Sequence, residues 1–152
     1  MPVLKREATI RWLGHPPHGA PRLTVGSRSI APWLSLPVDS EATDPLATLP
    51  GELLAGAIGG VFTWLVAEQL VKEGTQAREL VSYVTLTLSG EAADATDAAL
   101  SGITCRMSGR VAGVEETHLE VVAQAAMTRC IERLGMRTEG IGVTVAASLE
   151  GS

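Results

Sequence analysis

The longest apolar stretch of the chain, residues 53–67, constrains its fold more than any other feature. It reads LLAGAIGGVFTWLVA, and only Thr63 within it carries a hydroxyl, amide or charged group. A helix that is apolar on all sides is either a core helix or a membrane span. The stretch is shorter than the roughly 20 residues that cross a bilayer, and Glu52 and Glu68 bracket it. We therefore expect a buried core helix and no membrane association.

This helix is expected to run from Pro50 to Gly74. Proline is tolerated in a first helical turn, and glycine is a common C-terminal stop. Gly56, Gly59 and Gly60 each weaken the helix by about 1 kcal/mol relative to alanine. Close approach of another backbone would compensate, and the spacing of Gly56 and Gly60 allows a tight helix–helix crossing. The helix would be about 36 Å long, more than a small domain needs, so we expect two copies to pack together in a homodimer.

Composition bounds the class of protein. The chain has 152 residues, 45% of them hydrophobic and 19% charged, which fits a single globular domain over 1–152. A net charge of −5 without a basic run argues against nucleic-acid binding. The amino terminus has no apolar signal region, so a cytoplasmic location is expected. The two cysteines, Cys105 and Cys130, are too few for a disulfide framework or a four-cysteine zinc site.

Two hydrophobic periodicities alternate along the chain. Alternation with period two predicts strands, and a stripe of period 3.6 predicts a second helix. That second helix is expected to start at a capping box formed by Thr117 and Glu120 and to end at Gly135. The order of elements predicts an α+β fold of antiparallel strands interrupted by two helices. The expected strands are 7–13, 22–27, a short or edge strand at 30–36, 80–88, 103–111 and 141–149.

Three side chains of this pattern have both structural and chemical interpretations. Glu52 either complements the positive end of the helix dipole or is a buried carboxylate that orients an arginine. Cys130, on the inner stripe of the second helix, is either a small buried hydrophobic residue or a thiol activated by a nearby cation, for which Arg133 is better placed than Arg129. Cys105 is expected to pack in the core.

Metal binding is not expected. His15 and His18 lie in a proline-rich turn, and no third ligand follows at short spacing. His118 is the remaining imidazole. The acidic connection between residues 38 and 49 is interpreted as a solvated loop. No glycine-rich phosphate loop, nucleophile elbow or paired zinc motif is present in the sequence, so no cofactor is expected.

The central helix and its flanks resemble the OsmC/Ohr family, the osmotically inducible and organic hydroperoxide resistance proteins. Family members carry a pattern like N-P-E-E-L-hydrophobic-x-A-x-x-A-A-C-F, followed by a long apolar helix that ends near E-x-G. Here the matching run is PGELLAGAIGGVFTWLVAEQLVKEG. The order of elements also matches over nearly the whole chain. The resemblance implies an OsmC-like intertwined α+β homodimer, with antiparallel sheets around the paired central helices and a second helix beside them.

The resemblance also implies a chemistry. Enzymes of this family reduce organic hydroperoxides with a peroxidatic cysteine in the central helix and a resolving cysteine in the second helix. An arginine and a glutamate tune the first thiolate, and a lipoyl-type dithiol often recycles the enzyme. Glu52 falls at the position of the family's glutamate, and Cys130 at that of its resolving cysteine. The arginine slot falls near His18 or Gly19, and neither Arg22 nor Arg28 matches it in register.

Val61 occupies the position of the peroxidatic cysteine, just before Phe62. An isopropyl group has no lone pair with which to attack a peroxide. The sequence therefore favours an OsmC/Ohr-like protein of the oxidative-stress-resistance type that is not an active peroxidase. It would bind a small apolar ligand at the dimer interface, near Glu52, Val61 and Phe62.

One alternative is a thiol-dependent peroxidase or redox sensor that uses Cys130 alone, with Glu52 as a second catalytic residue. Another is unrelated chemistry, or a purely structural role, on the same scaffold.

Overall fold

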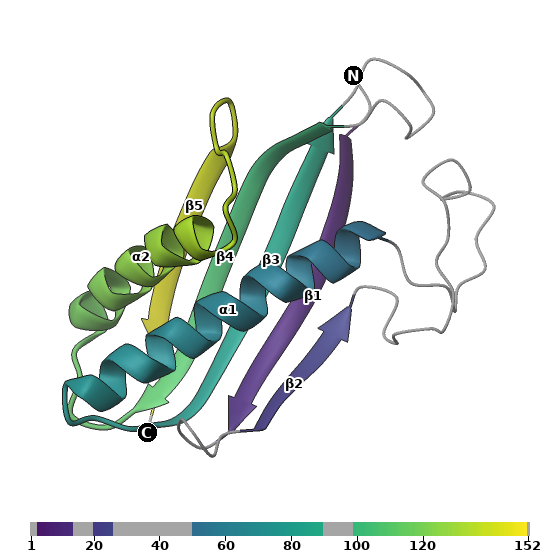
Figure 1. Cartoon of the computed structure of the whole chain (residues 1–152). Helices are drawn as coiled ribbons and strands as arrows, with labels where there is room; N and C mark the ends of the chain where they lie inside the picture. Colours follow the sequence, from purple (N-terminus) through teal and green to yellow (C-terminus); the bar gives the residue numbers. More distant parts are fainter. Residues whose placement is uncertain (1–2, 14–19, 26–49, 90–98, 152) are drawn as a thin grey trace.

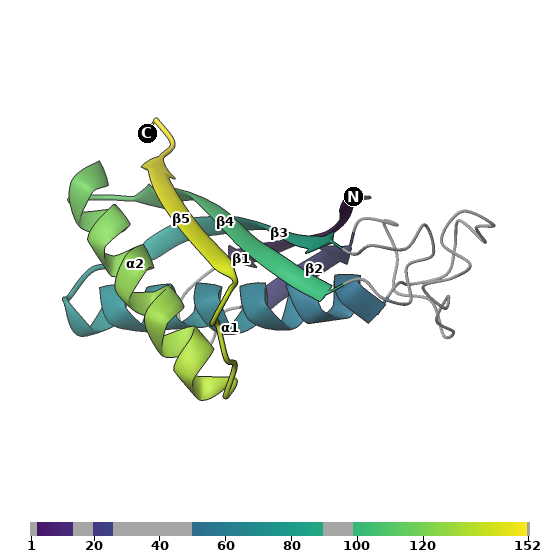
Figure 2. The same cartoon turned by 90° about the horizontal axis from the view of Figure 1, so that it is seen from above.

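A computed structural model of the chain describes residues 3–13, 20–25, 50–89 and 99–151. Within these residues one five-stranded sheet carries both helices on the same face (Figures 1 and 2). The helices are α1 (Pro50–Lys72) and α2 (Glu116–Arg133). The strands are β1 (Val3–Leu13), β2 (Ala20–Val25), β3 (Ala77–Ser89), β4 (Ala99–Val111) and β5 (Gly142–Leu149). The expected α+β class is confirmed.

The strand order in the sheet is β2-β1-β3-β4-β5. The first three neighbouring pairs are antiparallel, but β4 and β5 are parallel. The expectation of antiparallel strands is therefore wrong for β5. After β4 the chain returns along α2, which packs against both β5 and α1, so β5 enters the sheet in the direction of β4. Period-two alternation shows that a segment is a strand, but it carries no information on its direction relative to the neighbouring strand.

The alternation of side chains in β3 and β4 is confirmed. The buried face of β3 includes Leu80 and Val84, and that of β4 includes Ile103 and Cys105. Their intervening residues, such as Tyr83, face away from the helices and are exposed. The sheet thus has an inner face that packs on the helices and a wet outer face, as antiparallel sheets commonly do.

Helix α1 is the core helix that its apolarity predicts. By length and composition it would be able to cross a membrane, but here it packs along the inner face of the sheet against β1 and β3. It ends before Gly74, whose φ of 81° is a conformation that glycine adopts without strain. Gly59 lets the helix approach the sheet, because a Cβ there would collide with the side chains of Ile10 and Val84.

With Thr117 as its N-cap, α2 would begin at His118, but it begins two residues earlier, at Glu116. Its N-cap is Glu115, in an extended conformation and without a side-chain cap hydrogen bond. The expected capping box is therefore wrong: Thr117 already lies inside the helix, and the amides of His118 and Leu119 bond to the carbonyl of Glu115. The buried stripe that the 3.6-residue period predicts is present. It includes Met127, which the period did not single out, and excludes Leu134, which is 38% exposed. It consists of Leu119, Val122, Ala123, Ala126, Met127 and Cys130.

Several expectations fall outside the described residues. These are the short strand at 30–36, the histidine-containing turn at 14–19 and the acidic connection at 38–49. The hairpin of the first two strands is confirmed, with β2 at Ala20–Val25 in place of 22–27.

Candidate functional site

The candidate site residues on α1 project in different directions. Glu52 lies in the first turn and is only 4% exposed, and Phe62 is fully buried. Val61 is partly buried and packs at the edge of the core. Because Glu52 and Val61 are about two and a half turns apart, their side chains leave opposite sides of the helix. Within one chain, the helix geometry does not place Glu52 and Val61 on one surface.

Cys130 lies against the α1 turn that contains Val61. Its side chain is fully buried, and the thiol donates a hydrogen bond to the carbonyl oxygen of Ile58 at 3.4 Å. Burial raises the pKa of the Cys130 thiol to about 11, and the backbone amide of Phe62 offsets part of this rise. A thiol with such a pKa is almost entirely protonated near neutral pH. The structure thus places Cys130 against the α1 turn that contains Val61. The Cys130 side chain there is a neutral thiol, not a thiolate.

Cys105 has the packing role expected for it. It is fully buried on the inner face of β4. Burial, and to a smaller extent the proximity of Cys130, raises the pKa of its thiol to about 12. Both cysteines are free thiols.

The outward face of α1 is apolar. At helical spacing it presents small and large apolar residues, two of them substantially exposed, Leu53 at 37% and Leu54 at 41%. Nothing in the described chain comes within 4 Å of a Cβ built on Gly60. We call this surface the α1 stripe; it consists of Leu53, Leu54, Ala57, Gly60, Val61 and Trp64. Helix α1 is thus buried against its own sheet on one side and uncovered by the described chain on the other.

An aromatic pair closes one end of the α1 stripe. Trp64 meets Trp12 of β1 edge to face, with ring centroids 5.3 Å apart. Trp12 is 3% exposed, and within the described residues its indole Nε1–H has no hydrogen-bond partner. Trp12 shares the buried face of β1 with Ala8 and Ile10, as period-two alternation predicts, but no sequence signal indicates the unpaired N–H group.

Ionic contacts surround α1 without forming a metal site. Among the described residues no group of three or more His, Cys, Asp or Glu side chains converges. His118 instead bonds Glu73 at 2.6 Å, which ties the start of α2 to the end of α1. His15 and His18 lie outside the described residues. Arg22 lies on β2 opposite Arg11 of β1, while Arg28 is again outside the described residues.

The comparison with solved structures identifies the fold as OsmC-like. An organic hydroperoxide resistance protein OsmC from Legionella pneumophila superposes with a TM-score of 0.59 at 16% identity, over 92% of this chain and 96% of that one. An OsmC-like protein from Mycoplasma pneumoniae gives 0.58 at 14% identity, over 74% and 77%. The organic hydroperoxide resistance protein OhrB of Bacillus subtilis gives 0.53 at 14% identity, over 93% and 97%. No protein-family model and no curated protein sequence matches the chain.

Proposed function

We propose that this chain is a divergent cytoplasmic member of the OsmC/Ohr family that lacks peroxidase activity and binds a small apolar molecule at a homodimer interface. The OsmC-like fold supports the family, and the residues of the site support the loss of activity. The observation that carries the proposal is that the chain has Val61 and a neutral Cys130 at the two positions where the resemblance places reacting sulfurs. The first side chain is an isopropyl group, and the second is a protonated, buried thiol.

The α1 stripe supports the proposed interface. Contiguous apolar surface on a soluble protein marks a binding surface, and this surface is a helix face with a glycine at its centre, where another backbone can approach. Val61 lies in the α1 stripe, so an apolar ligand held between two subunits would contact it. Trp12 and Trp64 would form the aromatic end of that space.

The test is an assay of hydroperoxide consumption. Purified protein is mixed with cumene hydroperoxide and dihydrolipoamide, and the remaining peroxide is measured over time. We expect no consumption above the rate of the dithiol alone. Turnover by the wild-type protein that is lost in Cys130→Ser would overturn the proposal and establish the alternative, a peroxidase that depends on Cys130 alone.

Alkylation of the native protein provides a second measurement. A thiol with a pKa near 11 and no exposed surface reacts slowly with iodoacetamide at pH 7, because only the thiolate reacts. We expect Cys130 to be labelled only after unfolding. Rapid labelling of the folded protein would favour the redox-sensor alternative.

A further inference from the structure

The outer face of the sheet carries an excess of positive charge, although the whole chain has a net charge of −5. Glu79 already forms an ion pair with Arg11, at 2.6 Å. In β1, β3, β4 and the residue that follows β5, the charged side chains of this face are the cations Lys5, Arg11, Arg78, Arg106 and Arg110 and the carboxylates Glu7, Glu79 and Glu150. The remaining charges of the chain are predominantly acidic, so this face is the surface of the molecule that favours an anionic partner.

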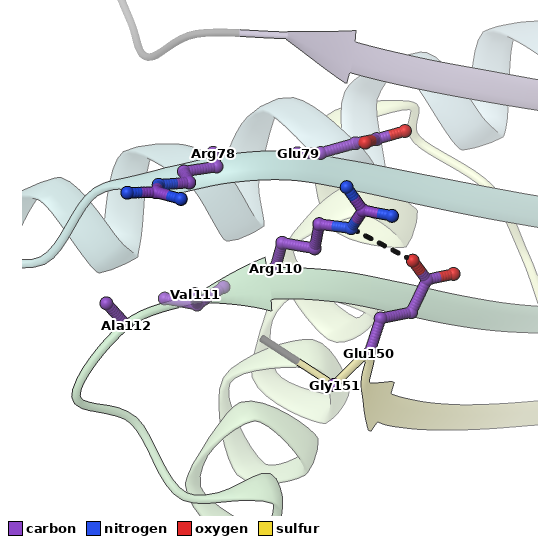
Figure 3. Close-up of a pocket in the computed structure, with 7 residues that line it drawn as sticks. All are labelled: Arg78, Glu79, Arg110, Val111, Ala112, Glu150 and Gly151. Carbon is purple, nitrogen blue, oxygen red and sulfur yellow. Dashed lines mark hydrogen bonds and ion pairs between the residues drawn. The ribbon is translucent and has the colours of Figure 1, made fainter.

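Two adjoining cavities lie on this face. The first has a volume of about 340 Å³, and its lining residues are Arg78, Glu79, Arg110, Val111, Ala112, Glu150 and Gly151 (Figure 3). The second has a volume of about 440 Å³ and is lined by Tyr83, Arg106, Ser108 and parts of β5. Glu150 lines both, and thus stands where the two cavities meet.

The carboxylate of Glu150 shows how an anion is bound here. The hydroxyl of Ser108 donates a hydrogen bond to one of its oxygens at 2.6 Å, and Nε of Arg110 contacts the other at 3.3 Å. The Ser108 hydrogen bond first, and then Arg110, hold the pKa of Glu150 below its ordinary value. Arg110 uses only Nε in this contact, so its two terminal NH₂ groups are left as donors.

A β-bulge adds another cation. The register of β3 and β4 shifts between Ala77 and Glu79, so Arg78 is an extra residue on its strand. Bulges redirect side chains, and Arg78 extends on the Val111 and Ala112 side of Arg110 (Figure 3). Within the described chain Arg78 has no ion pair or hydrogen bond.

We propose that the outer face of the sheet binds a phosphate monoester, with its phosphate group on Ser108 and Arg110, Arg78 as a further cation at the edge of the site, and its organic group in the cavity beside Tyr83. Glu150 occupies the position of the phosphate until the ligand displaces it. A tetrahedral dianion has enough acceptor oxygens for the Ser108 hydroxyl and for the NH₂ groups of Arg110 that the Glu150 carboxylate leaves unused. Tyr83 is 45% exposed, and Arg106 lies 6.0 Å from its ring centroid, so a planar group has an aromatic surface and a cation beside it. This site is separate from the α1 stripe.

The experiment is a calorimetric titration of the full chain with phenyl phosphate and with inorganic phosphate, at constant ionic strength. We expect phenyl phosphate to bind more tightly than inorganic phosphate. Arg110→Gln should weaken the binding of both probes about tenfold, the loss expected for a charge-assisted contact. Arg78→Gln should weaken it less, because Arg78 contributes only its charge at longer range. Glu150→Gln should strengthen it severalfold, because it removes the competing charge. Tyr83→Ala should weaken only the binding of phenyl phosphate.

The matched control is Arg137→Gln, which removes an exposed cation that lines neither cavity. It should leave both affinities unchanged. All five variants alter partly or fully exposed side chains, and circular dichroism will confirm that they are folded. The proposal is overturned if phenyl phosphate does not bind, if Arg137→Gln weakens binding as much as Arg110→Gln does, or if Glu150→Gln weakens it.

Discussion

Cys105 and Cys130 carry thiols whose pKa values lie at about 12 and about 11 in the folded chain. An unfolded cysteine has a pKa of about 8.5. The native state therefore keeps these protons at a pH where the unfolded state loses them. The resulting stabilisation is complete below about pH 8.5 and is lost as the pH rises through the folded pKa values.

We expect the free energy of unfolding to fall between about pH 9 and 10.5, with each thiol contributing up to about 1.4 kcal/mol per pH unit. Urea unfolding at several pH values measures this slope. Cys105→Ala will be less stable at every pH because it leaves a cavity, but its slope should be shallower than that of the wild-type protein. Equal slopes would show that the Cys105 thiol is not protected from ionisation.

Val61 offers a test by restoration. Val61→Cys places a sulfur in the α1 turn that Cys130 contacts through the Ile58 carbonyl. Its thiolate would attack a hydroperoxide oxygen, forming an S–O bond as the O–O bond breaks and the alcohol leaves. The Cys130 thiol would then displace water to form a disulfide, which a dithiol reduces.

We expect Val61→Cys to consume cumene hydroperoxide at least about tenfold faster than the wild-type protein, with dihydrolipoamide as the reductant, because it restores the nucleophile. The double variant Val61→Cys/Cys130→Ser is the control, because it keeps the new thiol but cannot form the internal disulfide. If Val61→Cys is as inactive as the wild-type protein, the loss of one sulfur does not by itself explain the absence of activity.

At the scale of the elements, one buried polar contact joins α1 to the sheet. Thr63 donates a hydrogen bond to the carbonyl of Gly59 at 2.7 Å, and its oxygen lies 2.8 Å from the hydroxyl of Ser82 on β3. Thr63 has a single hydroxyl proton, so Ser82 is the donor of the second bond. Both residues are fully buried.

Removing the Thr63 hydroxyl should therefore lower the free energy of unfolding more than removing the Ser82 hydroxyl does. Thr63→Val leaves the Ser82 donor buried without its acceptor and should cost about 1–3 kcal/mol, whereas Ser82→Ala leaves Thr63 bonded to Gly59 and should cost about 1 kcal/mol. Chemical denaturation of both variants and of the double variant measures the coupling. A double variant that costs the full sum of the two would contradict a shared hydrogen bond.

The sequence predicts an element correctly where the pattern of apolar and polar residues within that element is enough to show which of its faces is buried. The apolarity of α1, the alternation of β3 and β4 and the stripe of α2 are all of this kind. The direction of β5 depends on its neighbour in the sheet, and nothing in its own alternation reports it. The prediction of a capping box was wrong because the spacing of Thr117 and Glu120 is the same wherever the helix begins, so the spacing alone does not locate the first helical residue.

The candidate site shows the same limit. The sequence located Cys130 on a buried stripe and Val61 in the central helix. The spacing of Glu52 and Val61 already implies that they leave opposite sides of α1, but which of the two sides packs on the sheet depends on the rotation of the helix, which the sequence does not show. The outer-face cavities were also missed: alternation marked Arg106, Ser108 and Arg110 as exposed, but Glu150 reaches them only through the parallel pairing of β4 and β5.

At the scale of the whole molecule, the two faces of the helix layer have different partners. One packs on the sheet. On the other, Trp64 meets Trp12, while Leu53, Leu54 and Ala57 of the α1 stripe are exposed. If two chains associate through it, the helices approach most closely at Gly60. A side chain at this position starts into open space, because beyond the adjoining helix backbone no described atom lies within 4 Å of a Cβ on Gly60. Leucine there would also raise helix propensity by about 1 kcal/mol. The same side chain would hold two helices apart.

We therefore expect the wild-type protein to be a dimer by light scattering after size-exclusion chromatography. Gly60→Leu should be a folded monomer, or a dimer whose dissociation constant is about tenfold higher. Arg133→Leu is the matched control, since it adds the same side chain at an exposed position of α2 outside the α1 stripe. It should leave the dimer intact. A dimer that tolerates Gly60→Leu would place the interface elsewhere.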